Sequence, residues 1–123
     1  MKPLNPNSTK QLLERIDNAT NAELRSITIV DPTTMQLRMS AQDRNRGFDW
    51  IDIIFEISGI NSAQLVDDCK LSFVDTVEGI SILFDGGSVG LGVGSYASMD
   101  ALRASGLFFI GNGIKYAETD FSG

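Results

Sequence analysis

Carboxylates are the most frequent side chains in this chain that could carry chemistry. Of the 123 residues, 16 are Asp or Glu and 10 are Lys or Arg. Eight carboxylates occupy the middle of the chain, at Asp49, Asp52, Glu56, Asp67, Asp68, Asp75, Glu78 and Asp85. Paired carboxylates can perform general acid–base chemistry, as in glycoside hydrolysis, or bind Mg²⁺ or Ca²⁺.

The spacing of these carboxylates favours neither catalysis nor metal binding. Asp52 and Glu56 are four residues apart in an expected strand, on the same face as Trp50 and Ile54, and this spacing separates their Cα atoms by about 13 Å. That is too far for a shared proton or a single ion. The Asp-x-Asp-x-Asp-Gly pattern of a calcium loop is also missing. We therefore expect no metal or other cofactor, and we interpret the carboxylates as a solvated or partner-facing acidic surface.

Trp50 lies between Asp49 and Asp52 and is a second candidate for a functional role. A tryptophan beside acids can anchor a basic partner, because its ring stacks on arginine and supplies desolvated area. A lone tryptophan is more often part of the core, so both positions stay open from the sequence.

Residues 86–95, with the sequence GGSVGLGVGS, are similar to a glycine-rich phosphate loop. A P-loop ends in Gly-Lys-Ser/Thr, and a dinucleotide loop leads directly into a helix. Here the glycines alternate with apolar residues and no lysine follows. We interpret the segment as a strand whose bare face lets a helix or another backbone approach closely, and the N-terminal helix is one candidate.

Residues 42–47 form a predicted charged loop with two arginines, Arg44 and Arg46. Two guanidinium groups could clamp a carboxylate or a phosphate. We expect instead that they pair locally with Asp43 or Asp49.

Several reaction chemistries are excluded by composition. The chain has no histidine and one cysteine, Cys69, so it cannot form a Cys/His zinc site, a Ser-His-Asp triad or an internal disulfide. We expect Cys69 to be a small buried apolar side chain.

The distribution of charge favours a basic partner. The net charge is −6, and residues 47–123 carry three basic and eleven acidic side chains. Such a surface repels nucleic acid and attracts cationic proteins. The alternative is that the acidity only keeps the protein soluble. No secretory leader or membrane span is recognisable, so we expect one cytoplasmic domain over residues 1–123.

Hydrophobic spacing predicts the elements that must position these side chains. A helix capped by Ser8 or Thr9 buries Leu12, Leu13 and Ile16. A short helix capped by Ser98 spans 99–105 and ends at a left-handed Gly106. Alternating or short apolar runs predict strands near residues 23–29, 35–40, 48–57, 71–74, 80–84, 88–94, 107–110 and 114–116, the last two as a pair. Turn residues at 31–34 and 85–87 predict two hairpins.

The predicted fold class is therefore α+β: a mostly antiparallel sheet of about six to eight strands, with an N-terminal helix and a short helix near the C-terminus. A compact acidic domain of this type, with Phe48-Asp49-Trp50-Ile51-Asp52 on a central strand, one unpaired cysteine and no histidine, resembles the small cytoplasmic immunity proteins that accompany bacterial polymorphic and contact-dependent growth-inhibition toxins. The resemblance lies in the type of chain and not in a motif. It implies stoichiometric binding of a basic toxin domain, often a nuclease, whose active site is blocked by carboxylates that imitate phosphates.

Our hypothesis is thus a non-enzymatic binding protein for a basic partner. The expected partner-binding residues are Asp49, Asp52, Glu56, Asp67, Asp68, Asp75 and Glu78, with Trp50 and Tyr96 as the dry centre. One alternative is a homodimer formed through apolar edge strands such as residues 107–110. Another is an enzyme that uses Ser95 and Tyr96 beside the glycine strand.

Overall fold

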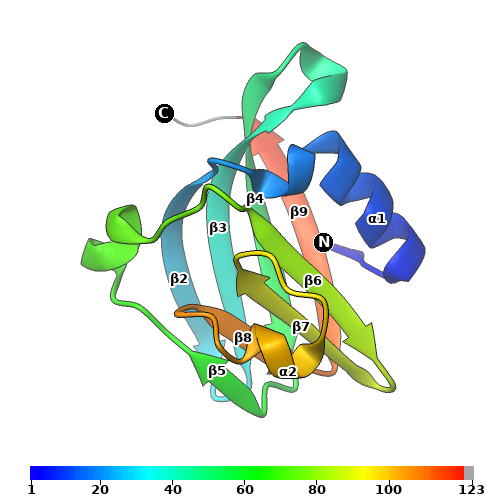
Figure 1. Cartoon of the computed structure of the whole chain (residues 1–123), viewed down its shortest axis with the longest axis vertical. Coiled ribbons are helices and arrows are strands. Elements are labelled where there is room, and N and C mark those ends of the chain that lie inside the picture. The colour runs from blue at the N-terminus through cyan, green and yellow to red at the C-terminus, as the bar shows by residue number, and fades with distance from the viewer. Residues whose placement is uncertain (121–123) are drawn as a thin grey trace.

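A computed structural model of the chain describes residues 1–120 and shows two antiparallel sheets packed face to face (Figure 1). Sheet A has the strand order β1 (Lys2–Pro3), β9 (Gly113–Asp120), β4 (Asp49–Ser58), β3 (Thr34–Asp43), β2 (Glu23–Asp31). Sheet B has the order β5 (Ser62–Gln64), β8 (Phe108–Gly111), β7 (Ser88–Val93), β6 (Ile80–Asp85). The helical segments are α1 (Pro6–Arg15), α2 (Met99–Leu102) and the 3-10 turns η1 (Asp17–Ala19), η2 (Arg44–Arg46) and η3 (Asp68–Phe73).

The predicted fold class is confirmed, since the described chain is α+β and mostly antiparallel sheet. The structure has nine strands within residues 1–120, one more than the expected range. Two of them, β1 and β5, are only two and three residues long and too short to show an alternating pattern. None of the helices in this part of the chain has the length and apolar character needed to cross a bilayer.

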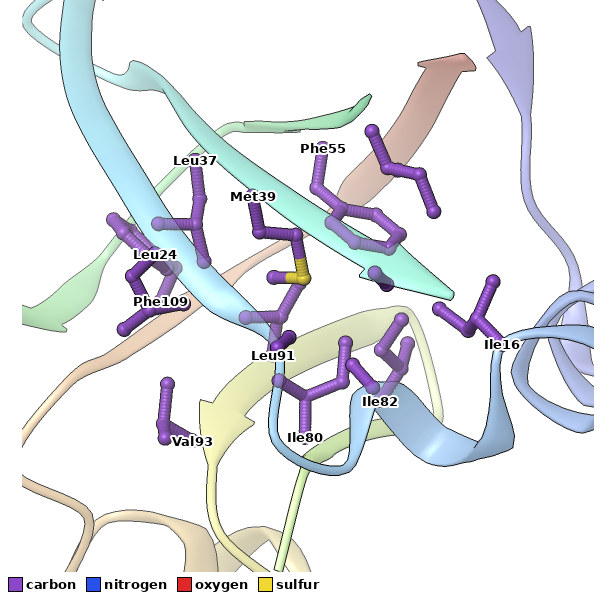
Figure 2. Close-up of a cluster of buried hydrophobic side chains, with 14 of the residues drawn as sticks. Ile16, Leu24, Leu37, Met39, Phe55, Ile80, Ile82, Leu91, Val93 and Phe109 are labelled. Carbon is purple, nitrogen blue, oxygen red and sulfur yellow. The ribbon is translucent and has the colours of Figure 1, made fainter. Parts of the chain in front are cut away.

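The core lies between the two sheets because alternate residues of each strand point inward. Figure 2 shows these side chains meeting: Leu37, Met39 and Phe55 from sheet A, with Ile80, Ile82, Leu91 and Phe109 from sheet B. The hairpins predicted at residues 31–34 and 85–87 are both present, as β2–β3 and β6–β7.

Helix α1 closes one side of the sandwich, where Leu12 and Ile16 join the core. Its N-cap is Asn5 and not Ser8 or Thr9: the Ser8 N–H donates to Asn5 Oδ1 at 2.8 Å, and the Asn5 N–H donates to Ser8 Oγ at 3.0 Å. The helix begins earlier than expected because Pro6, which lacks an N–H and has a helix-compatible φ, is well suited to its first position.

The glycine strand has the packing role expected of it, but its partner is α2 and not the N-terminal helix. A Cβ at Gly90 would lie 2.7 Å from the Met99 sulfur, and one at Gly92 would lie 2.8 Å from Leu102 Cγ. Ser98 caps α2 through the Ala101 N–H, as predicted. The helix ends at Leu102, and Gly106 is not left-handed.

Two predicted elements near the middle and end of the chain were wrong. Residues 71–74 are not a strand, because Asp68–Phe73 form η3; a short apolar run does not by itself distinguish the two. Strands β8 and β9 are not a pair either, since the chain crosses from sheet B to sheet A at Asn112. β8 is paired on both sides, by β5 and β7, so residues 107–110 are not an edge through which two copies could join.

Candidate functional site

The structure distributes the nine expected partner-binding residues over four places. Four of them lie in the long connection between β5 and β6, and three lie on the outer face of sheet A. Asp49 begins β4, and Tyr96 lies in the loop after β7. The group in the β5–β6 connection is Asp67, Asp68, Asp75 and Glu78. The group on the outer face of sheet A is Trp50, Asp52 and Glu56.

The connection between β5 and β6, residues 65–79, is called the acidic connection here. It contains four carboxylates and one lysine, and its net charge of −3 is half of the net charge of the whole chain. In Figure 1 it runs along the β2 side of the sandwich, with η3 projecting outward. It is therefore a continuous acidic element on one side of the molecule.

Hydrogen bonds and one buried side chain hold the acidic connection in place. Asp68 Oδ1 accepts from the Ile27 N–H of β2 at 3.0 Å. Thr76 accepts from the Asn21 N–H at 2.8 Å through its carbonyl and donates its hydroxyl to the Ala22 carbonyl at 2.7 Å. Leu71 is only 2% exposed and joins the core. The connection is thus an ordered part of the fold despite its length.

The same segment exposes large apolar side chains to solvent. Phe73, at the end of η3, is 84% exposed, and Val77 is 62% exposed. The sequence does not reveal the exposure of Phe73, because the apolar run at residues 71–74 predicts a strand. The neighbouring Asp75, which forms a turn by accepting from the Val77 N–H at 2.9 Å, was the available signal that the strand could not continue.

The four carboxylates of the acidic connection differ in their internal contacts. Asp68 and Asp75 accept backbone hydrogen bonds that shape the segment. The carboxylates of Asp67 and Glu78 are exposed and have no hydrogen-bond or ion-pair partner within residues 1–120. Asp67 and Glu78 can therefore receive a cationic group without breaking a contact of the described fold.

Asp52 does not belong to an exposed acidic surface, contrary to expectation. Its side chain is buried, 1% exposed, on the outer face of sheet A. Ser40, directly opposite on β3, donates to its Oδ1 at 2.5 Å, and Arg38 donates to its Oδ2 at 2.7 Å. Arg25 Nε in turn donates to Ser40 Oγ at 2.8 Å. Asp52 was misplaced because sequence spacing does not reveal these cross-strand neighbours, which cover and neutralise it.

Glu56 and Trp50 share the face of Asp52, as the strand pattern predicted. Glu56 is half-buried and accepts from Gln36 Nε2 at 2.9 Å across the β3–β4 pair. Trp50 is also half-buried and lies outside the buried core between the sheets. This face is therefore a network of internal contacts and offers less unpaired charge than the acidic connection.

The predicted pairing of Arg44 or Arg46 with Asp43 or Asp49 was wrong: among the described residues Arg46 pairs with Asp120 at 3.6 Å, and Asp43 is bound by Arg15 of α1. Arg15 Nε and Nη2 donate to the two oxygens of buried Asp43 at 3.0 and 2.8 Å, and Arg15 Nη2 also donates to Glu118 at 2.6 Å. Burial acts to raise the pKa of Asp43, but hydrogen bonds from Arg15 and from the Asn45 N–H outweigh it, so that pKa lies below its ordinary value. The pKa of Arg15 is raised, chiefly by its hydrogen bond to Asp43. Burial acts to lower it, but the bond to Glu118 adds to the effect of Asp43.

Cys69 was expected to be buried, but it is exposed in η3. Residues 68–70 are exposed, and this short helix sends only Leu71 into the core. The thiol is thus accessible and lies four positions before Phe73 in the chain.

The concave regions of the described chain contain no recognisable metal site: no three Asp, Glu or Cys side chains of residues 1–120 are grouped to hold an ion. A hollow of about 580 Å³ lies between α1 and β9, where Arg15 is already paired. Ser95 and Tyr96 line a smaller one of about 270 Å³ together with Glu78 and Ser81. The Ser81 hydroxyl is occupied, since it donates to the Gly94 carbonyl and accepts from the Tyr96 N–H.

The chain matches no protein-family model, no curated protein and no solved structure. The assignment of a function therefore rests on the geometry and charge described above.

Proposed function

We propose that this chain is a non-enzymatic binding protein that captures a basic protein partner through the acidic connection. The observation that carries the proposal is Phe73, which is 84% exposed on an ordered segment whose net charge is −3. An apolar centre within a charged rim is the usual anatomy of a protein interface.

Phe73 supplies the apolar centre in this proposal. Fully burying a phenylalanine that was exposed contributes about 1.5–3 kcal/mol through the hydrophobic effect. Because Leu71 and Thr76 already hold the segment in place, little chain entropy is lost when a partner covers it.

The carboxylates supply attraction and selectivity. Asp67 and Glu78 are exposed without internal partners among the described residues, so they can pair with lysine or arginine and accelerate association. The same charge disfavours nucleic acid, whose phosphates it repels.

The finer form of the proposal is neutralisation of a basic toxin domain. It is supported by the resemblance of this acidic α+β chain to bacterial immunity proteins. In that role, the carboxylates of the acidic connection occupy the cationic groove where a nuclease holds phosphates, and Phe73 packs beside it.

The proposal is tested by affinity capture from lysate of the native cell at low salt and at ~0.5 M salt. The higher salt shortens the range of attraction between exposed charges. We expect capture of a basic protein of domain size that weakens at high salt. Phe73→Ala should weaken capture at least about tenfold, whereas Phe48→Ala, which removes another exposed phenylalanine outside the acidic connection, should retain it.

A charge-matched pair completes the test. Asp67→Lys/Glu78→Lys should weaken capture at least about tenfold. Asp49→Lys/Asp100→Lys changes the net charge equally at exposed positions elsewhere and should have a much smaller effect. Equal capture by wild type and Phe73→Ala would overturn the proposal, as would recovery of only the bait, which would indicate self-association.

A further inference from the structure

The four end strands of the two sheets differ in how their open edges are protected. β1 has two residues, one of them Pro3, and β5 has three. β2 is long, but η3 lies against it and Asp68 accepts its Ile27 N–H. Short strands, proline and covering segments are the usual means of preventing an edge from pairing with another chain. β6, with six residues and the sequence ISILFD, is neither short nor interrupted by proline; α1 and η1 lie beside it, but neither forms a hydrogen bond with its backbone.

The register of the β6–β7 hairpin shows which backbone groups of β6 point to the open edge. Asp85 and Ser88 flank the two-residue turn and form a hydrogen-bonded pair, as such turns require. The pattern then alternates, and the Gly94 N–H to Gly79 carbonyl bond of 2.8 Å continues it. The N–H and C=O groups of Ile80, Ile82 and Phe84 therefore face away from β7. None of these groups has a hydrogen-bond partner in the described chain.

A groove runs beside this edge, between β6 and α1. One part of about 520 Å³ is lined by Thr9, Lys10, Leu13, Ile82 and Phe84, among others. A second part of about 270 Å³ shares Leu13 and Ile82 with the first and so continues it along the strand. Figure 1 shows β6 as the outermost strand of sheet B on the side where α1 lies.

Thr9 also lines the groove, but its hydroxyl, the one buried side-chain polar atom without a hydrogen-bond partner in the part of the chain that the structure describes, is not exposed to it. The groups that the groove offers to a ligand are the row of unpaired backbone donors and acceptors of β6 at strand spacing. A ligand that satisfies such a row is itself an extended backbone.

We propose that the open edge of β6 binds an extended basic segment of a partner protein by strand addition. Charge selects this occupant: Glu14 and Glu78 line the groove and Asp85 ends β6, against the single cation Lys10. A second copy of this chain is disfavoured, because two molecules of net charge −6 repel each other.

The surroundings of β6 also define the sequence of the segment. The groove brings the apolar side chains Leu13, Ile82 and Phe84 together with the exposed carboxylate of Glu14, and Glu78 lies farther along it. The fitting segment therefore alternates apolar and basic residues, as a half-buried strand does.

The probe for this proposal is a synthetic eight-residue peptide of alternating valine and lysine with blocked ends. We expect saturable changes in the NMR signals of the Ile80, Ile82 and Phe84 amides and at least about tenfold slower hydrogen exchange at these amides when they become paired. The same peptide with alternate backbone nitrogens methylated keeps its side chains and charge, loses strand pairing and should have no such effect. A valine–glutamate peptide should not bind.

A matched pair of variants tests the edge itself. Phe84→Ala and Phe84→Pro both remove the ring, but only the proline removes an edge N–H, and neither removes a β6–β7 hydrogen bond. We expect Phe84→Pro to bind the valine–lysine peptide at least about tenfold more weakly than Phe84→Ala. If Phe84→Pro does not fold, the comparison of the methylated and unmethylated peptides on the wild-type protein tests strand pairing instead.

Three outcomes would overturn the inference: no change at β6 with millimolar peptide, equal effects of the methylated peptide, or protection of the β6 amides that rises with protein concentration alone, which would mean self-pairing. This test of β6 is independent of the capture test of the acidic connection, because Phe73→Ala should leave peptide binding at β6 unchanged.

Discussion

Gly79 determines how the acidic connection rejoins the sandwich. Its φ of +73° is a left-handed conformation that glycine adopts readily. A Cβ at this position would lie 2.0 Å from the Asn18 carbonyl oxygen, which is backbone and cannot rotate away. The close approach places Thr76 where it binds Asn21 and Ala22. One residue without a side chain thus supports the position of the whole acidic segment.

Gly79→Ala should lower the free energy of unfolding by at least about 2 kcal/mol, because it combines backbone strain with a clash against fixed atoms. Gly87→Ala is the control, since no atom lies within 4 Å of its Cβ position and its φ is not left-handed; it should change stability by less than about 0.5 kcal/mol. Urea unfolding followed by the fluorescence of Trp50 measures both. Equal midpoints for the two variants would contradict this account of Gly79.

At the scale of elements, η3 places a core side chain, Leu71, and an exposed side chain, Phe73, two positions apart. Leu71 points into the core, whereas Phe73 points to solvent. A strand over residues 71–74 would have placed Leu71 and Phe73 on the same face, because side chains alternate with a period of two. The 3-10 turn instead places them in different environments, and this is what leaves Phe73 exposed to solvent.

Leu71→Ala should therefore destabilise the protein by about 2–4 kcal/mol through loss of burial and formation of a cavity. Phe73→Ala should change the free energy of unfolding by less than about 0.5 kcal/mol, as expected for an exposed site. Thermal and urea unfolding of the two variants give the comparison. A large loss of stability in Phe73→Ala would mean that its ring packs within the fold and is not free for a partner.

At the scale of the whole molecule, the ion pairs of Arg15 tie α1 to both β3 and β9. Asp43 is 1% exposed, and its pKa is lowered, so its ionised form is bound more tightly in the folded state than in the unfolded chain. A lowered folded pKa contributes stability that is present above the ordinary value of 3.8 and is lost as the pH falls through the folded value.

Asp43→Asn should lower the free energy of unfolding at neutral pH by about 1–3 kcal/mol, because Arg15 loses its charged partner in a buried site. The difference from wild type should shrink as the pH falls below 3.8. Urea unfolding across this range is the measurement, with exposed Asp67→Asn as the control. A difference that stays constant with pH would show that the ionised form of Asp43 is not favoured by folding.

The sequence by itself determined the hairpins and the strong central strand β4, because alternation and the turn residues Pro32, Gly86 and Gly87 are local signals. It also determined the acidity of the surface. Local signals state which side chains share a face but not what covers that face. For that reason Asp52 was placed on the correct face but wrongly expected to be exposed.

Only the tertiary structure decided which strands share a sheet, because strand pairing depends on contacts between segments far apart in the chain. It separated β8 from β9, placed α2 on the glycine strand and left β6 with an open edge. It also turned residues 68–73 into a helix against β2, with Leu71 inside and Phe73 outside. The difference is physical: periodicity is a property of a few neighbouring residues, whereas burial is decided by everything that packs against them.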